Sequence, residues 1–422
     1  AAHQPKPVLI TYFIFKYWPT SVYIKADDIW NDTTISTTNT TSNKIITLNG
    51  NLTIANGGIL TLTNVTLMVN CTFNGEHRIE VRNNGTLYIN GGSIITALNT
   101  SNSFLFWVDL GAIFQMNNSE LHYCGYFSTS NIETWGLWIN TNNTIIENNT
   151  LTNNYLGIVL QSAYNNTVIN NTATNNNGLG YYLYNSSYNN LSGNTATNNN
   201  GGGFELYSSS YNNLSGNTAT NSNNYGFYLY SNSSNNNLPS NLALNCTAGY
   251  YRSPDSTNNN FTGSKALNYL RVNVTDGSGS PITGADVKVD TDGIVVYATP
   301  HFGGSNSTTV SGVIPWIPVQ YGIFTTGDSI TLNTTTVTVW NSTASFSNNP
   351  RTVDTSWTHV ETFQVGQPSS PPEQPLLLPV VFYTLMSASV QGGVSPLVYV
   401  VIGVAIVAGV IAALIYHLHR KV

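Results

Sequence analysis

The fold of this 422-residue chain is decided by two consecutive 23-residue units, GLGYYLYNSSYNNLSGNTATNNN (residues 178–200) and GGGFELYSSSYNNLSGNTATNSN (residues 201–223). Related units precede and follow them, so that a glycine recurs at intervals of 23 residues. A unit of this length holds three short strands and cannot bury its own apolar side, so neighbouring units must stack. The recurring glycines are Gly157, Gly180, Gly203, Gly226 and Gly249.

The alternation of side chains predicts which residues fill the interior of the stack. In each strand that follows a glycine, the first and third residues face the same side. The expected inward columns are Ile158, Tyr181, Phe204, Phe227 and Tyr250, and Leu160, Leu183, Leu206 and Leu229. At one corner we expect a hydrogen-bonded ladder in left-handed backbone, formed by Asn149, Asn171, Asn194, Asn217 and Asn241. With the glycines supplying tight corners, the pattern predicts an all-β parallel β-helix with coils of 22–24 residues.

A known family carries a similar pattern. The repeat N-N-x-(I/L)-x-x-N-x-(A/L)-x-N-N…G-(I/F/Y)-x-L of residues 142–252 resembles the right-handed parallel β-helix repeats of the NosD-like family and of related archaeal surface proteins. The resemblance implies this fold for about half of the chain and says little about function. The copper-related role implied by the family name has no support here, because Met and Cys number three each and His is absent between Gly125 and Pro300.

The rest of the chain divides by composition. Residues 1–45 are expected to form an N-terminal segment, whose apolar stretch Val8–Ile24 caps the β-helix of residues 46–265. Residues 266–365 begin with alternating residues and Gly/Pro turns that resemble carboxypeptidase-regulatory-like and immunoglobulin-like β-sandwich modules. A proline-rich stalk and an apolar juxtamembrane segment are expected over residues 366–396.

The C-terminus predicts an attachment to membrane lipid. Residues 397–416 form an uncharged apolar run that would span roughly 30 Å as a helix. The basic tail, residues 417–422, is expected in the cytoplasm, so the protein is predicted to be a single-pass cell-surface protein with its N-terminus outside. A start without Met is typical of a mature chain that has lost a signal peptide. Candidate N-glycosylation sites include Asn31, Asn51, Asn70, Asn84, Asn117, Asn185, Asn232, Asn260, Asn306 and Asn341.

Charge is scarce and asparagine is abundant. Charged residues make up 8% of the chain, the net charge is −6, and the sequence contains 60 Asn. Thirteen Lys and Arg residues spread over this length exclude a basic nucleic-acid-binding surface. A rod held by neutral groups should lose little stability when carboxylates become protonated, so we hypothesise that the composition suits an acidic exterior. The three cysteines fit no zinc motif, and either free thiols or one Cys71–Cys124 bridge is compatible with them.

Few residues suggest chemistry. Between Thr134 and Tyr251 the charged residues are Glu147 and Glu205, which lie in non-equivalent strands. The densest polar cluster is EHRIEVR, residues 76–82, with Asp109, Glu120 and His122 downstream. A solvated face with ion pairs is favoured there over a catalytic site. No catalytic residue, cofactor or metal site is predicted, although Asp286, Asp290 and Asp292 could bind a structural calcium ion.

The strongest functional feature is a row of aromatic residues expected on the outer face of four successive coils. Such a row could bind a glycan or a protein partner, or it could simply cover the sheet. Its members are Tyr182, Tyr184, Tyr207, Tyr228, Tyr230 and Tyr251, with Glu205 among them.

The sequence therefore favours a non-enzymatic, membrane-anchored, N-glycosylated surface protein with a structural (S-layer-like or envelope) or adhesive role. Its expected partners are N-glycans and other surface-protein subunits or further copies of itself. Two alternatives stay open. One is a β-helix protein that binds carbohydrate or processes polysaccharide, and the other is a membrane-anchored spike of a virion.

Overall fold

The computed structural model of the protein describes residues 26–366. The expected cap at Val8–Ile24, almost all of the stalk, the apolar span 397–416 and the tail 417–422 lie outside the described residues. Within residues 26–366, no helix is long and apolar enough to cross a membrane.

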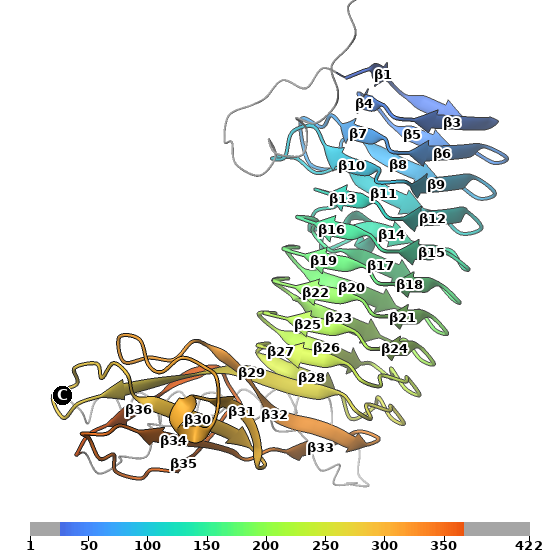
Figure 1. Ribbon diagram of the computed structural model, residues 1–422. Coiled ribbons are helices and arrows are strands. Elements are labelled where there is room, and N and C mark those ends of the chain that lie inside the picture. The colour runs from blue at the N-terminus through green and yellow to red at the C-terminus, as the bar shows by residue number, and fades with distance from the viewer. Residues whose placement is uncertain (1–25, 367–422) are drawn as a thin grey trace, which may run out of the picture. The chain divides into compact units, whose positions relative to one another are not determined.

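The predicted parallel β-helix is present; it has about ten turns and comprises residues 28–267. Most coils contribute one strand to each of three parallel sheets, and Figure 1 shows these strands stacked coil upon coil. In the β-helix, sheet 1 consists of β1 (Asp28–Trp30), β4 (Ile45–Leu48), β7 (Thr66–Val69), β10 (Ile94–Ala97), β13 (Glu120–His122), β16 (Thr150–Thr152), β19 (Thr172–Thr174), β22 (Thr195–Thr197), β25 (Thr218–Thr220), β27 (Leu242–Leu244) and β29 (Lys265–Thr275). Sheet 2 consists of β2 (Thr33–Ile35), β5 (Leu52–Ile54), β8 (Arg78–Val81), β11 (Leu105–Val108), β14 (Leu137–Ile139), β17 (Ile158–Gln161), β20 (Leu179–Tyr184), β23 (Gly202–Tyr207), β26 (Tyr225–Tyr230) and β28 (Ala248–Arg252). Sheet 3 consists of β3 (Thr38–Ser42), β6 (Ile59–Thr63), β9 (Thr86–Asn90), β12 (Ile113–Asn117), β15 (Ile145–Glu147), β18 (Thr167–Ile169), β21 (Asn190–Ser192) and β24 (Asn213–Ser215).

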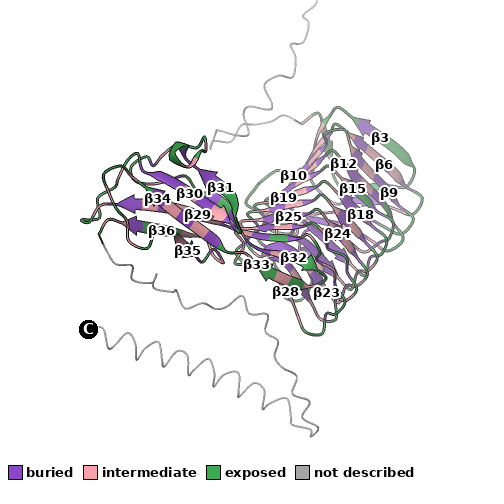
Figure 2. Ribbon diagram, turned by 60° about the horizontal axis from the view of Figure 1, so that its bottom comes forward, coloured by how far each residue is buried: buried purple, intermediate pink, exposed green. Residues whose placement is uncertain are grey.

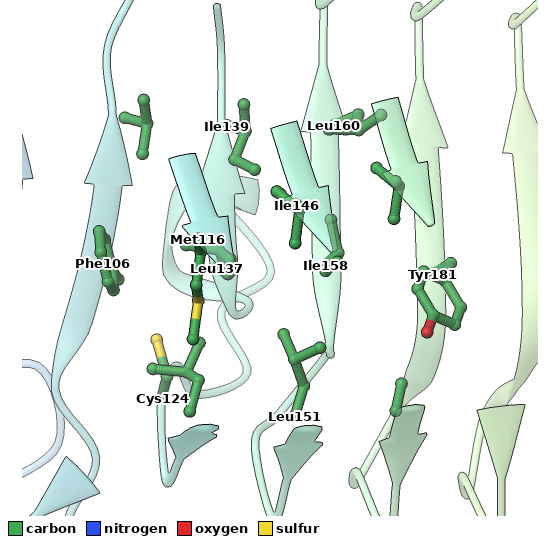
Figure 3. Packing of buried hydrophobic residues seen from close by; sticks show 14 of the residues in the cluster. Phe106, Met116, Cys124, Leu137, Ile139, Ile146, Leu151, Ile158, Leu160 and Tyr181 are labelled. Carbon is green, nitrogen blue, oxygen red and sulfur yellow. The ribbon is translucent and has the colours of Figure 1, made fainter. Parts of the chain in front are cut away.

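The register of the sheets follows the 23-residue period. In sheet 2, Tyr181 pairs with Phe204 and Leu183 pairs with Leu206, so equivalent residues lie one above the other. The predicted inward columns are buried, and the ring centroids of Tyr181 and Phe204 lie 4.6 Å apart with nearly parallel planes. Figure 3 shows the same column continuing through earlier coils as Phe106, Leu137 and Ile158.

The recurring glycines have a different role from the one expected. None of the five has positive φ, so they do not supply left-handed corners. A Cβ placed on Gly203 would lie 2.5 Å from the carbonyl oxygen of Gly226 and 2.6 Å from the Cβ of Ala219. The glycines are therefore required because the strand packs directly against the next coil and against a column of alanines. That column is Ala173, Ala196, Ala219, Ala243 and Ala266.

The predicted asparagine ladder is present and fully buried. The Asn194 side chain accepts a hydrogen bond from the backbone N–H of Asn171 (2.9 Å) and donates to the carbonyl oxygen of Val168 (2.7 Å). The ladder runs without a break from Ser119, through the five predicted asparagines, to Ser264. Left-handed backbone occurs one residue earlier than expected, at positions such as Asn170 and Gly193.

Three further ladders occupy other corners of the coils. One consists of Asn166, Asn189, Asn212, Asn236 and Asn259; another of Asn154, Asn176 and Asn199; and a third of Ser186, Ser209, Ser233 and Ser256. Buried polar groups in these turns are satisfied by the equivalent side chain of the next coil, which explains why the chain is so rich in asparagine.

The β-helix begins earlier than predicted and is covered at its C-terminal end. Its first coil starts at Asp28 rather than near residue 46, because β1 already pairs in parallel with β4. At the other end, β29 pairs with β27 and then continues away from the stack. Tyr321 and Phe324 from the following hairpin join the interior of the β-helix, and Arg252 pairs with Asp328 (3.0 Å). The stack ends close to Arg252, as expected.

Two sheets make up the region after the last coil. β29 pairs with β32 (Ile317–Thr326) and β36 (His359–Gln364), and β32 pairs with β33 (Ser329–Leu332). Sheet 4 contains β30 (Asp286–Thr291), β31 (Ile294–Ala298), β34 (Thr335–Trp340) and β35 (Arg351–Val353). The described residues also include two short 3₁₀ helices, η1 (Ile132–Thr134) and η2 (Pro300–Phe302). Residues such as Val272, Val289 and Val337 fill a second core between these sheets, and Figure 2 shows buried residues in both regions.

Candidate functional site

Three consecutive coils carry long loops at the corner between sheet 1 and sheet 2. These loops are residues 70–77, 98–104 and 123–136, whereas the next coil needs only residues 153–157 to make the same connection. In Figure 1 these loops belong to the cyan part of the stack. In repeat proteins, insertions collect on one face, and that face is often the binding face.

The longest of these loops is rich in aromatic residues and is held firmly. The indole N–H of Trp135 donates to the carbonyl oxygen of Ser128 (2.9 Å), and the Thr134 hydroxyl donates to the carbonyl oxygen of Asn131 (2.9 Å). Trp107 on β11 fixes the loop from below by donating to the carbonyl oxygen of Glu133 (2.8 Å). The loop is therefore a fixed part of the surface.

The loops surround a depression of about 290 Å³. Four aromatic side chains line it, together with amide and hydroxyl groups, and no charged residue of the described chain does so. Phe127 is 59% exposed and packs against Trp135 and Tyr155, with ring centroids 6.5 and 5.7 Å away. The lining residues are Asn74, Thr100, Ser101, Asn102, Ser103, Tyr123, Gly125, Tyr126, Phe127, Asn153, Asn154, Tyr155 and Asn177.

The predicted tyrosine row lies beside this depression on the outer face of sheet 2. Tyr182 is buried, because the Trp135 ring stacks on it at 6.1 Å. The Tyr184 and Tyr207 rings stack on each other at 5.0 Å, and Tyr228 and Tyr230 do so at 4.3 Å. With Tyr251, these four are half-buried, and their flat faces are largely taken up by neighbouring rings. The row thus covers sheet 2, and the open aromatic surface belongs to the loop.

Glu205 lies within the tyrosine row as a half-buried carboxylate. The Tyr230 hydroxyl donates to it at 2.7 Å. Burial raises the pKa of Glu205 above its ordinary value, and the bond from Tyr230 opposes part of that rise. Burial also raises the pKa of Tyr228, to about 12.

The structure divides the predicted polar cluster between two faces. On sheet 2, Glu80 pairs with Arg78 (3.3 Å) and Arg82 (3.1 Å). Asp109 follows in the next coil of that sheet, and burial, helped by the Glu80 charge, raises its pKa. Glu120 and His122 pair on sheet 1 (2.8 Å), and this hydrogen bond lowers the pKa of Glu120. Glu147 lies on sheet 3 and Glu205 on sheet 2, so the two carboxylates occupy non-equivalent strands of different coils, as expected.

The three aspartates considered for calcium have separate protein partners. Asp286 is buried and accepts hydrogen bonds from Thr299 Oγ1 and the His301 N–H. Asp290 pairs with Lys288, and Asp292 accepts from the Thr334 N–H. Among the described residues, no group of three His, Cys, Asp or Glu side chains is gathered as a metal site. All three cysteines are free.

The candidate glycosylation sites differ in exposure. Half of them lie on the surface: Asn31, Asn84, Asn185, Asn232 and Asn306 are exposed. The others, Asn51, Asn70, Asn117, Asn260 and Asn341, are half-buried. Several of these side chains already have partners; the Asn70 amide, for example, donates to Asn49.

Sequence reasoning missed the aromatic residues of loop 123–136. The tyrosine row belongs to the regular units, whereas the candidate site lies where the 23-residue period is interrupted. The usable signal was the unusually long interval between the β13 and β14 patterns, which carries Tyr123, Tyr126, Phe127 and Trp135.

Comparison with known proteins agrees with the fold. A family model described as "Right handed beta helix region" matches residues 58–243, in agreement with the parallel β-helix of the structure. The chain is similar in structure to the periplasmic alginate epimerase AlgG, with 16% identity, a TM-score of 0.28, and coverage of 50% of this chain and 67% of that chain. A variant of the same epimerase gives 13% identity and a TM-score of 0.30, covering 55% and 61%. The chain thus spans about two thirds of the length of these structures, and no curated protein matches it.

Proposed function

We propose that this chain is a membrane-anchored surface protein that binds a neutral glycan at the depression beside loop 123–136, without chemically altering it. The observation that carries the proposal is the cluster of aromatic rings and uncharged polar groups at the one corner where three consecutive coils lengthen their loops. The role belongs to the adhesive class that the sequence favours.

The chemistry of the lining supports a sugar as the ligand. A sugar ring offers C–H groups that pack on aromatic faces and hydroxyl groups that both donate and accept hydrogen bonds. Phe127 and Tyr155 supply the first kind of contact. Amides such as Asn177 and hydroxyls such as Ser103 supply the second. Because the lining carries no charge, a neutral glycan suits it better than an acidic one.

The surface location rests on the sequence. The apolar run 397–416, the proline-rich stalk and the many candidate glycosylation sites are the features expected of an anchored ectodomain. Structural assembly with further copies of the chain is compatible with this role.

The test compares two exposed phenylalanines on two of the three long loops. Phe127 lines the depression and is 59% exposed, whereas Phe73 is 60% exposed and does not line it. We expect Phe127→Ala to weaken binding on an array of neutral glycans by about tenfold, and Phe73→Ala to leave it unchanged. Equal binding by the wild type and both variants, or no binding by the wild type, would contradict the proposal.

A second candidate, polysaccharide processing, rests on Asp109. Its raised pKa and its neighbours Glu80 and Arg82 give it one property of a general acid. If the chain cleaves a polysaccharide, incubation should release new chain ends, and Asp109→Asn should abolish the release. Binding that depends on Phe127 without any new chain ends would favour the first candidate.

A further inference from the structure

One corner of the coils holds the ladder of Asn154, Asn176 and Asn199. Its side chains change near the C-terminal end of the β-helix. Asn154, Asn176 and Asn199 occupy this corner in successive coils, but the next two coils place Ser222 and Cys246 there. Both side chains are shorter than asparagine. The Ser222 hydroxyl is buried and has no nitrogen or oxygen partner among the described residues, and its polar neighbour is the Cys246 thiol, a weak partner.

This corner opens into a pocket of about 390 Å³. That volume lies within the range of small-molecule sites, roughly 300–1,000 Å³. One wall is the β-helix, and the other is the loop before β36, which carries Trp357. The lining residues are Asn221, Ser222, Asn223, Asn245, Cys246, Thr247, Asn268, Ser356, Trp357 and Thr358.

Both walls are held by hydrogen bonds. Thr358 Oγ1 donates to Asn245 Oδ1 (2.6 Å), and the buried Asn268 amide donates to the carbonyl oxygen of Thr355 (3.1 Å). The Trp357 ring is half-buried and packs beside His359, at 5.1 Å between centroids. The two walls of the pocket are thus joined by hydrogen bonds, and an aromatic ring lies on one side.

A polar group remains available at the pocket. The amide nitrogen of Asn223 donates to Asn200 (2.6 Å), which leaves its amide oxygen without a hydrogen-bond donor among the described residues. The Ser222 hydroxyl is buried beside the Cys246 thiol and is not itself exposed to a ligand. No charged group of the described chain lines the pocket, and the open amide oxygen of Asn223 can accept a hydrogen bond from a ligand.

We propose that this pocket is a second, separate site that binds a neutral sugar of one or two rings. Trp357 packs against the face of the sugar, while the amide oxygen of Asn223 accepts a hydrogen bond from one of its hydroxyl groups. The proposal does not depend on the site beside loop 123–136, because the two pockets share no residue.

Cys246 provides a direct readout of occupancy. It is half-buried at the pocket, whereas Cys71 and Cys124 are buried elsewhere and serve as internal controls. The full-length chain, kept in a detergent without a sugar headgroup, is alkylated in the presence of glucose, galactose, mannose, N-acetylglucosamine or glucuronic acid. At least one neutral sugar should slow alkylation of Cys246, and glucuronic acid should protect it less.

Substitutions separate binding from general stabilisation. We expect Trp357→Ala to raise the Kd of the protecting sugar by about tenfold or more, and Asn223→Ala to raise it by a smaller factor. Trp316→Ala removes an exposed tryptophan of the same region that does not line the pocket, and should leave the Kd unchanged. Because Asn223 is exposed, Asn223→Ala should fold normally. It therefore tests the site even if Trp357→Ala does not fold.

The outcomes are distinct from those of the first site. Protection of Cys246 that survives Phe127→Ala but not Trp357→Ala supports two sites. Absence of protection by all four neutral sugars, or equal protection in Trp357→Ala or Asn223→Ala and the wild type, would overturn the second site and leave the first untouched.

Discussion

The early coils, residues 28–122, and the regular coils, residues 142–266, share one fold but are held together differently. In the early coils the interior is mainly aliphatic, with residues such as Leu48, Ile54 and Leu87, and several turns use positive-φ glycines such as Gly57. In the regular coils, asparagine and serine ladders fill the corners. Aliphatic packing is non-directional, whereas a ladder requires each side chain to lie directly over its equivalent.

This difference relates the packing to the position of the proposed site. A ladder fixes the coil length wherever its amides must meet, so insertions are excluded there. The long loops 70–77 and 98–104 precede the ladder that contains Asn154. Loop 123–136 begins where that ladder begins, because the Cys124 N–H donates to Asn154. Loops can therefore vary at this corner in the early coils. The pocket at Cys246 lies where the same ladder ends.

The strongest test of the ladder is Asn194→Ala. The substitution removes the acceptor of the Asn171 N–H and leaves the Val168 carbonyl without its side-chain donor, all in the buried interior. Because each buried unsatisfied group costs about 1–3 kcal/mol, we expect the free energy of unfolding to fall by about 3 kcal/mol or more. Denaturant unfolding measures it.

The matched control is Asn200→Ala, which removes an exposed amide that accepts a bond from Asn223. Its effect should stay within about 0.5 kcal/mol. Similar losses in the two variants would mean that the buried ladder contributes no more than the exposed one, and the comparison between the two sets of coils would fail.

The next largest effect separates two reasons for a glycine. Gly203 has close neighbours and no positive φ, whereas Gly216 has φ of +62° and open space around it. Asparagine tolerates left-handed backbone but needs room. We expect Gly203→Asn to lower the free energy of unfolding by about 1–3 kcal/mol or more, as overpacking does. Gly216→Asn should leave the free energy of unfolding nearly unchanged. Thermal unfolding of both variants gives the answer, and tolerance of asparagine at Gly203 would contradict the close-packing explanation.

These glycines also show what the sequence could and could not predict. The period itself revealed the columns through Tyr181 and Phe204 and the ladder through Asn194, because one coil predicts the next. It did not reveal why Gly203 is glycine, since positive φ and close approach select the same residue. Loop 123–136 was missed for another reason: its position depends on tertiary contacts such as that between Trp135 and Tyr182, which no repeat pattern encodes.

A smaller effect concerns Glu205 in the regular coils. Burial raises the folded-state pKa of Glu205, so ionisation of its carboxyl group lowers the free energy of unfolding. This loss of stability is absent below the pKa of the unfolded state, roughly 4.3, and complete above the pKa of the folded state. Glu205→Gln should therefore raise the melting temperature at pH 7 and leave it unchanged at about pH 3. The amide oxygen of this variant can still accept the hydrogen bond from the Tyr230 hydroxyl. An equal rise at both pH values would point to packing rather than charge.

The smallest expected change tests strain at an exposed corner. Tyr188 and Tyr211 have φ near +60°, while the equivalent positions in other coils, Asn165, Asn235 and Asn258, carry the residue that tolerates this conformation. The two rings are 58% and 52% exposed and stack at 5.1 Å, so Tyr188→Asn loses one exposed ring contact and relieves one strained residue. We expect a net stabilisation of about 0.5 kcal/mol, measured by denaturant unfolding. A clear loss of stability would show that the stacked pair contributes more than the strain costs, and that aromatic ladders support the regular coils even at their exposed corners.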